Sequence, residues 1–233
     1  MSTICEGQGK DVLLLHGYLS CKESFYFQIK FLSDYFKVTA PDMPGFGKSF
    51  ALTQAYSVGN YSDWLESFIN ASKINSPYII AHSFGARVAF KYLSTRPNGC
   101  SKLIITGGAG IVKPRSAQYM RRVNAYRRVK KLFPRFAEKH FGSKEYRTLS
   151  PVMKESYKAI VNEDLKNCAK AIKCPTLLIY GNSDTVTPAG EEGATFNNLI
   201  EGSRLEIMEG GHFCFSENSD IFNKLIYDFL LEN

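Results

Sequence analysis

The stretch from residue 77 to residue 96 constrains the fold more than any other segment, because it leaves no room for a loop between a strand and a helix. It reads PYIIAHSFGARVAFKYLSTR, with a short apolar run directly after a proline. Such a run is typical of a strand buried on both faces of a parallel sheet. Apolar residues then recur at helical spacing from Val88, and Pro97 ends that pattern. Ser83 is therefore expected in a sharp turn between a buried strand and a helix.

The residues around Ser83 fit a tight turn that presents a nucleophilic serine. Neighbouring backbones come close together in such a turn, and the small residues Ala81 and Gly85 stand two positions before and after the serine. This is the G-x-S-x-G pattern of a nucleophile elbow, with alanine in place of the first glycine. The alternative is an ordinary helix-capping serine between a buried strand and a helix.

Strands and helices alternate along most of the 233 residues, which are enough for one domain with a large core. Six further strands are expected, at residues 3–6, 11–15, 37–40, 102–106, 175–180 and 204–208. This alternation predicts an α/β fold with a mostly parallel sheet and helices on both faces. Helical, basic and aromatic sequence interrupts it, so we expect a core of residues 1–108 and 164–233 and an inserted unit of residues 109–163.

A serine hydroxyl is a weak nucleophile and needs an imidazole to accept its proton. His212 is the best candidate among four histidines, because it follows a strand in a Gly-Gly-His loop at the edge of the sheet where ligands bind. A loop histidine without a role is the alternative. Side chains of neighbours diverge on a sharp turn, so His82 is assigned to packing or to support of the catalytic residues. His16 is expected to order the loop after the first core strand.

A carboxylate should orient the imidazole, and it should lie between the serine and the histidine in chain order. Asp184 follows the strand that ends near Tyr180 and precedes His212 by 28 residues. The strand at 102–106 ends in glycines and alanine, without a carboxylate. Asp184 is therefore the best-placed candidate, and a turn-capping aspartate is the alternative interpretation.

Five short motifs connect the chain to a known superfamily. They are LLLHGYLS, PDMPGFGKS, AHSFGA, YGNSDTVTP and GGHFCF, in that order. Over essentially its whole length the chain resembles the α/β-hydrolase superfamily. It is most similar to the small single-domain branch with a helical lid, which contains carboxylesterases, carbon–carbon bond hydrolases and acyl-carrier esterases. The resemblance implies an α/β-hydrolase fold, Ser83, Asp184 and His212 as catalytic residues, and no cofactor.

The same resemblance places the oxyanion-binding N–H groups. Phe84 follows the nucleophile and begins a helix, so its backbone N–H is one expected donor. The N–H of Tyr18, in the loop after the first core strand, is the second by analogy. Such donors stabilise the negative charge that develops on the carbonyl oxygen during acyl transfer.

The inserted unit is expected to form a lid. Tyr119, Val123 and Tyr126 recur at helical spacing, and Ser150-Pro151 is a typical start of a second helix. We expect the apolar faces of these helices to cover Ser83 and to shape a largely apolar pocket. The alternative is a solid extension of the core without a gating role.

The lid also carries the positive charge of the chain. Lys113–Arg147 contains twelve Lys and Arg but two acids, a local charge of +10 compared with +7 for the whole chain. A solvated helix face is the simpler interpretation. The alternative is attraction of an anionic carrier or an anionic surface to the pocket entrance. Nucleic acid is not expected as a partner, because the aromatic residues fall on the face that a lid must bury.

Other features exclude several classes. The N-terminus lacks the pattern of a secretory signal, and no stretch approaches the ~18 apolar residues of a membrane span, so a cytoplasmic protein is expected. The six cysteines have no C-x-x-C pair and are expected to be buried thiols, and the histidines lack the spacing of metal ligands. The sequence thus predicts a serine carboxylesterase acting on a small or medium acyl ester. A non-hydrolytic enzyme, such as a lyase or perhydrolase, and a ligand-binding protein on the same scaffold remain alternatives.

Overall fold

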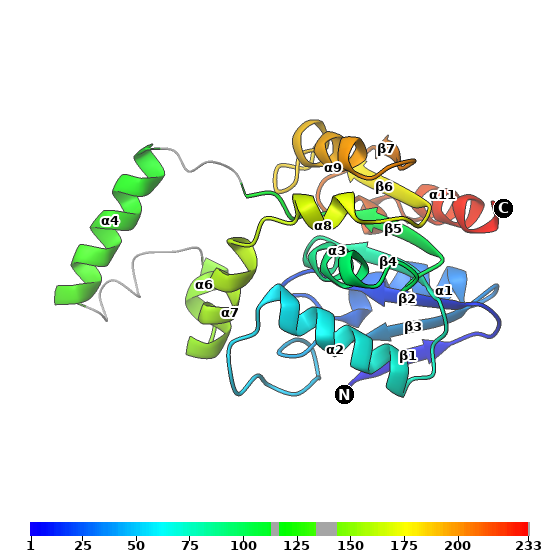
Figure 1. Cartoon of the computed structure of the whole chain (residues 1–233), viewed down its shortest axis with the longest axis horizontal. Coiled ribbons are helices and arrows are strands. Elements are labelled where there is room, and N and C mark those ends of the chain that lie inside the picture. The colour runs from blue at the N-terminus through cyan, green and yellow to red at the C-terminus, as the bar shows by residue number, and fades with distance from the viewer. Residues whose placement is uncertain (113–116, 134–143, 233) are drawn as a thin grey trace.

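A seven-stranded sheet forms the centre of the protein. The computed structural model describes residues 1–112, 117–133 and 144–232, apart from the side chains of residues 117–119, 122, 127, 130, 144 and 145. The strands lie in the order β1-β3-β2-β4-β5-β6-β7, and all neighbours are parallel except β1 and β3 (Figure 1). Their bounds are Thr3–Glu6 (β1), Asp11–Leu15 (β2), Lys37–Pro41 (β3), Tyr78–His82 (β4), Lys102–Thr106 (β5), Thr176–Gly181 (β6) and Arg204–Met208 (β7).

Helices cover both faces of this sheet, which confirms the predicted α/β-hydrolase architecture (Figure 1). One face carries α2 (Val58–Ala71), α3 (Phe84–Thr95), α8 (Lys166–Lys170), the π-helical turn η2 (Ala189–Gly193) and α9 (Ala194–Leu199). The other face carries the 3₁₀ turn η1 (Lys22–Phe25), α1 (Tyr26–Leu32), α10 (Cys214–Glu217) and α11 (Ser219–Leu231).

The alternation of side chains along each strand divides the core into two layers. In β2, Leu13 and Leu15 pack into the layer below α2 and α3, whereas Val12 and Leu14 pack into the layer below α1 and α11. This is the two-residue period of an extended strand. Because both faces are buried, the strand has to be apolar at every position, which is why the predicted strands read as continuous apolar runs.

The predicted N-terminal strand is present, and its partner is a more distant strand. Thr3 of β1 lies opposite Pro41 of β3 in an antiparallel pair, although β2 is the next strand in the chain. The aromatic-rich segment at residues 23–36 is helical in part: it begins as the η1 turn, and α1 ends at Leu32. All six cysteines are free thiols, but the prediction that all are buried is wrong for three of them. Cys100, Cys174 and Cys214 are buried, whereas Cys21 and Cys168 are partly exposed and Cys5 is exposed.

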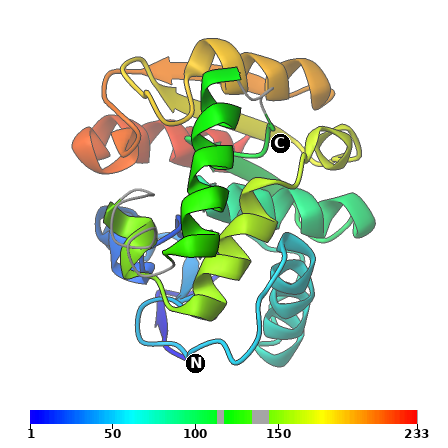
Figure 2. The same cartoon turned by 90° about the vertical axis from the view of Figure 1, so that its left-hand side faces the viewer.

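The segment between β5 and β6 contains α4 (Ala117–Leu132), α6 (Lys144–Thr148) and α7 (Pro151–Val161). Ser150 caps α7 by accepting the Met153 N–H at 3.2 Å, and proline occupies its first turn. Figures 1 and 2 show α4 outermost, with α6 and α7 between it and the sheet. Met153 and Ile160 of α7 are buried against the core, whereas Met120 and Leu132 of α4 are exposed. Within the described ranges, no helix has both the length and the apolar character needed to cross a membrane.

Candidate active site

Ser83 lies at the turn between β4 and α3, with φ 50° and ψ −104°. Serine seldom adopts a positive φ, so the surrounding structure must hold it there. Its N–H donates to the Thr106 carbonyl of β5 at 3.1 Å, and its own carbonyl accepts from Ala86 N–H at 3.1 Å. These two hydrogen bonds tie both sides of the turn to the sheet and to the first turn of the helix.

The small residues around the serine serve different purposes. A Cβ atom added to Gly85 would lie 2.2 Å from the Leu15 carbonyl oxygen, so only glycine fits where α3 crosses the end of β2. Ala81 is fully buried, and its methyl group packs in the core layer below α2 and α3. The methyl group that departs from the glycine pattern at this position therefore contributes to the core.

Asp184 and His212 lie together, as the sequence predicts. Asp184 Oδ2 is 2.8 Å from His212 Nδ1, and its carboxylate is buried. Asp184 Oδ1 accepts the N–H groups of Val186 at 2.8 Å and Thr187 at 3.0 Å. Burial raises the pKa of Asp184, but the hydrogen bonds from His212 and Thr187 outweigh it and lower the pKa to about 2. The group is thus a fixed anion next to the imidazole.

Thr187 is a member of this cluster that the sequence analysis missed. Its hydroxyl, which has one proton to donate, lies within hydrogen-bonding distance of two acceptors, Asp184 Oδ2 at 2.8 Å and the Gly107 carbonyl at 3.0 Å. It also lies 3.2 Å from His212 Nδ1. The signal available in the sequence was a threonine three residues after the aspartate, the spacing of a side chain that closes an Asp turn.

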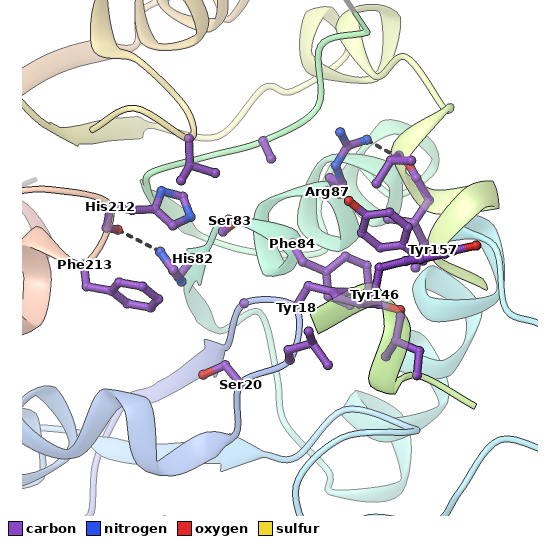
Figure 3. Close-up of a pocket in the computed structure, with 17 residues that line it drawn as sticks. Tyr18, Ser20, His82, Ser83, Phe84, Arg87, Tyr146, Tyr157, His212 and Phe213 are labelled. Atoms are coloured by element: carbon purple, nitrogen blue, oxygen red, sulfur yellow. Dashed lines mark hydrogen bonds between the residues drawn. The ribbon is translucent and has the colours of Figure 1, made fainter. Parts of the chain in front are cut away.

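The His212 ring faces Ser83 in Figure 3. With Nδ1 donating to Asp184, the neutral imidazole keeps Nε2 as its acceptor. The backbone of His212 is held separately, because its carbonyl oxygen lies 3.0 Å from His82 Nε2. Burial is the largest cause that lowers the pKa of His82, to about 3, so His82 is neutral and its Nε2–H donates to that carbonyl.

His16 orders the loop that follows β2, as expected. Its Nδ1 donates to the Gly17 carbonyl at 2.8 Å, and its Nε2 accepts the Met43 N–H at 3.0 Å. Burial lowers its pKa, which favours this neutral form. The ring therefore joins the loop after β2 to the loop after β3, and it sits beside the segment that carries Tyr18.

The backbone N–H groups of Tyr18 and Phe84 are available for a ligand. Phe84 is the first residue of α3, whose N–H has no intrahelical acceptor. Neither N–H donates to any residue in the part of the chain that the structure describes. The two side chains meet edge to face with ring centroids 5.5 Å apart, and both residues line the same cavity. The geometry is compatible with the oxyanion role expected for both N–H groups.

The cavity beside Ser83 has a volume of about 680 Å³, which is within the usual size range of ligand pockets. From the segment between β5 and β6 it is lined by Ala109, Tyr146, Leu149, Tyr157, Ile160 and Val161. The expected lining residues Val123 and Tyr126 are not among those that line it, and the side chain of Tyr119 lies outside the described residues. The described roof thus comes from α6 and α7.

One group of potential metal ligands is present among the described residues. Cys21, Glu23 and Asp42 place one ligand atom each within 4.8 Å of one another. The Lys22 ammonium occupies the space between the acids, at 2.8 Å from Asp42 and 2.9 Å from Glu23. The positive charge that these carboxylates require is therefore supplied by a side chain.

Comparisons with known proteins agree with this architecture. The family model described as "alpha/beta hydrolase fold" matches residues 11–150. A probable 1-acylglycerol-3-phosphate O-acyltransferase of Oryza sativa subsp. japonica is 24% identical over 282 residues, covering 95% of this chain and 67% of the relative.

Two solved structures superpose over almost the entire chain. An esterase from Exiguobacterium antarcticum has a TM-score of 0.80 at 24% identity, covering 99% of this chain and 95% of the esterase. The enol-lactonase from Burkholderia xenovorans LB400 has a TM-score of 0.78 at 20% identity, covering 99% and 96%. The match of the family model to most of the chain, on a sheet with this strand order, shows that the protein belongs to the α/β-hydrolase fold family.

Proposed function

We propose that the protein is a serine hydrolase that cleaves carboxylic esters through an acyl-enzyme, with Ser83, His212 and Asp184 as the catalytic triad. The observation that carries the proposal is the 2.8 Å contact between Asp184 Oδ2 and His212 Nδ1, next to a serine held at a positive φ in the wall of a cavity. An oriented imidazole and a hydroxyl that faces a cavity from a strained turn are the two parts that nucleophilic acyl transfer requires.

The first half of the reaction transfers the acyl group to the serine. Ser83 Oγ bonds to the carbonyl carbon while its proton passes to His212 Nε2, and Asp184 stabilises the imidazolium that forms. The carbonyl oxygen becomes an oxyanion and accepts the N–H groups of Tyr18 and Phe84. The bond to the leaving oxygen then breaks, and His212 returns its proton to that oxygen.

In the second half, water replaces the alcohol. His212 takes a proton from water, the hydroxide oxygen bonds to the acyl carbon, and Ser83 Oγ leaves with the proton from His212. If an alcohol enters in place of water, the same steps give acyl transfer. The name of the rice relative makes this second outcome worth measuring.

We propose a small or medium acyl group as the substrate, and residues 109–163 as a lid over it. Support comes from the apolar roof provided by Tyr157, Ile160 and Val161 and from a cavity volume of about 680 Å³.

The exposed basic residues of α4, such as Arg121 and Arg128, would attract an anionic carrier or an anionic surface to the entrance. Six free thiols are consistent with work in the reducing cytoplasm.

Labelling with a fluorophosphonate probe tests the nucleophile directly. Ser83→Ala should abolish labelling and turnover of 4-nitrophenyl esters, whereas Ser20→Ala, which removes another cavity hydroxyl, should keep the label. Persistence of labelling in Ser83→Ala contradicts the assignment. Labelling without ester turnover would favour a ligand-binding protein or a lyase-type enzyme on the same scaffold, and ester products with added alcohol would reveal transfer.

A further inference from the structure

The wall of the cavity contains a cation that the proposed reaction does not use. Arg87 lies on α3, four residues after Ser83, and lines the cavity although its side chain is 7% exposed (Figure 3). A helix rises about 1.5 Å per residue, so the two backbone positions are separated by about 6 Å along α3. Among the described residues that line the cavity, Arg87 is the one with a permanent charge.

Arg87 is partly fixed by the inserted helices. Its Nη1 donates to the carbonyl oxygens of Ile160 at 2.9 Å and Glu163 at 3.0 Å, at the C-terminal end of α7. These acceptors are neutral, although the partial negative charge of a helix C-terminus favours a cation. The contacts orient the guanidinium plane and leave its net charge without a counterion in the cavity wall.

No carboxylate of the described residues forms an ion pair with this guanidinium. Glu163 accepts from Arg87 through its backbone carbonyl, but its side-chain carboxylate pairs with Lys91 at 2.8 Å. The Nε and Nη2 groups of Arg87 donate to no acceptor in the described ranges. Burial is the largest influence on the pKa of Arg87 and lowers it. The charges of Glu192, Glu163 and Asp164, none of which lines the cavity, act in the opposite direction, but the pKa stays below its usual value. The protein groups around Arg87 therefore compensate only in part for the hydration that its charge loses on burial.

The rest of the wall cannot supply the missing anion. The roof beside Arg87 is formed by Ile160, Val161 and the phenol of Tyr157, and the floor by Tyr18 and Phe84. A buried guanidinium with two free N–H directions is matched best by a planar carboxylate, which accepts two parallel hydrogen bonds. A carboxylate carried by a ligand would therefore complete the hydrogen bonding of Arg87 and neutralise its charge on the cavity side.

We propose that Arg87 binds a carboxylate on the acyl group of the substrate, so that the preferred esters are monoesters of short dicarboxylic acids. This specificity rests on the proposed ester hydrolysis at Ser83. Arg87 and Ser83 lie one helical turn apart on α3 and line the same cavity, so we choose the glutaryl group as a short acyl chain that carries a terminal carboxylate. An acyl chain that is apolar in its middle and anionic at its end fits both the apolar roof and the cation.

The test compares two 4-nitrophenyl esters that differ by one charge. Mono(4-nitrophenyl) glutarate carries the carboxylate, and methyl 4-nitrophenyl glutarate masks it as an ester. We expect wild-type kcat/KM to favour the anionic ester by about tenfold or more, the effect of a charge-assisted hydrogen-bonded pair. Arg87→Met should reduce that ratio to near one, and Arg87→Lys should keep part of it, because it retains the charge without the planar fork.

A control variant separates binding from support of α7. Lys91→Met removes a cation and a tie to the same segment from the next turn of α3, but Lys91 does not line the cavity. It should leave the ratio of the two kcat/KM values at the wild-type value. A wild-type ratio near one, or an equal loss on both esters in Arg87→Met, overturns the proposal.

Binding without turnover distinguishes this proposal from failure of the proposed function. Glutarate should raise the melting temperature of the wild-type protein and of Ser83→Ala, whereas pentane-1,5-diol should not. Arg87→Met should lose the shift with glutarate. If no ester is hydrolysed but glutarate still binds through Arg87, the hydrolase proposal fails and the carboxylate site stands. If the neutral ester is hydrolysed and glutarate gives no shift, the carboxylate site fails and the hydrolase proposal stands.

Discussion

His82 Nε2 lies 3.0 Å from the carbonyl oxygen of His212, so the residue before the proposed nucleophile holds the backbone of the proposed base. The two rings also pack at a centroid distance of 4.7 Å. The turn after β4 and the loop after β7 are thereby joined at the point where Ser83 and His212 must meet. A neutral, buried imidazole suits this task, because it donates one hydrogen bond without placing a charge near the proposed base.

Loss of this contact should reduce activity more than stability. His82→Leu keeps an apolar side chain but removes the donor, so the His212 loop should shift and kcat should fall by about ten- to hundredfold. His82→Gln retains an N–H near the position of Nε2 and should recover part of the loss. Steady-state kinetics and urea unfolding of both variants check this, and equal kcat values for Leu and Gln would show that the hydrogen bond has no role.

Asp184 should make both catalysis and stability sensitive to acid. Its pKa in the folded protein, about 2, lies below the usual value near 3.9 in an unfolded chain, so its contribution to stability is complete above the higher value and is lost as the pH falls towards the lower one. Asp184→Asn should remove this part of the acid destabilisation and lower kcat by about 10⁴. Urea unfolding between pH 2 and pH 7 and ester kinetics at pH 7.5 measure the two effects. Wild-type activity in Asp184→Asn would mean that another carboxylate orients His212.

Gly85 should tolerate no side chain. Gly85→Ala would bring a Cβ atom within 2.2 Å of the Leu15 carbonyl oxygen, so either α3 or the end of β2 must move. We expect the free energy of unfolding to fall by about 1–3 kcal/mol and activity to be lost with the shape of the turn. Ala81→Gly, on the other side of Ser83, is the matched comparison and should retain the site. A stable, active Gly85→Ala protein would contradict this packing.

The lining of the cavity predicts which inserted helix controls chain length. Val161 of α7 lines the cavity, whereas Val123 of α4 does not. Val161→Trp should shift the preference among 4-nitrophenyl esters towards shorter acyl groups, since an apolar pocket discriminates by about 1–3 kcal/mol per methylene. Val123→Trp should leave the profile as it is. The opposite pattern would show that α4 closes over the pocket when substrate is bound.

The positive charge on α4 should affect kcat/KM only for substrates that are carried by an anionic partner. Arg121, Arg128 and Lys131 are exposed, and their triple replacement by glutamate should lower kcat/KM for an acyl-carrier-protein ester at low salt. Screening shortens to about 8 Å at physiological ionic strength, so the difference should shrink as salt is added. Reversal of Lys48, Lys73 and Lys170 makes the same change of net charge elsewhere. Equal behaviour of both triple variants would leave α4 as a solvated face.

Most of the fold can be predicted from local sequence patterns. The turn at Ser83, the buried strands and the helix start at Ser150 each depend on residues that are close in sequence, so the sequence predicts them well. The proximity of Asp184 and His212 can also be predicted from the sequence. Each follows one of two parallel strands, and the carboxyl ends of parallel strands lie at the same edge of a sheet.

Features that depend on how distant helices dock could not be predicted. Periodicity identifies an apolar face on α4, but it does not say where α4 lies, and the described roof is provided by α6 and α7. Arg87 reads as an ordinary basic residue on a helix until the end of α7 is seen to accept its Nη1. Thr187 likewise gains its place only once β5 brings Gly107 beside the Asp184 turn.

The backbone conformation at Ser83 presents the proposed nucleophile but lowers the stability of the folded protein. A positive φ costs a residue with a side chain about 1–3 kcal/mol, and glycine adopts it freely. Ser83→Gly should therefore relieve strain at the turn while it removes the proposed nucleophile. Selection of variants for thermal resistance alone would favour such inactive proteins, so stability screens on this scaffold need a simultaneous selection for turnover.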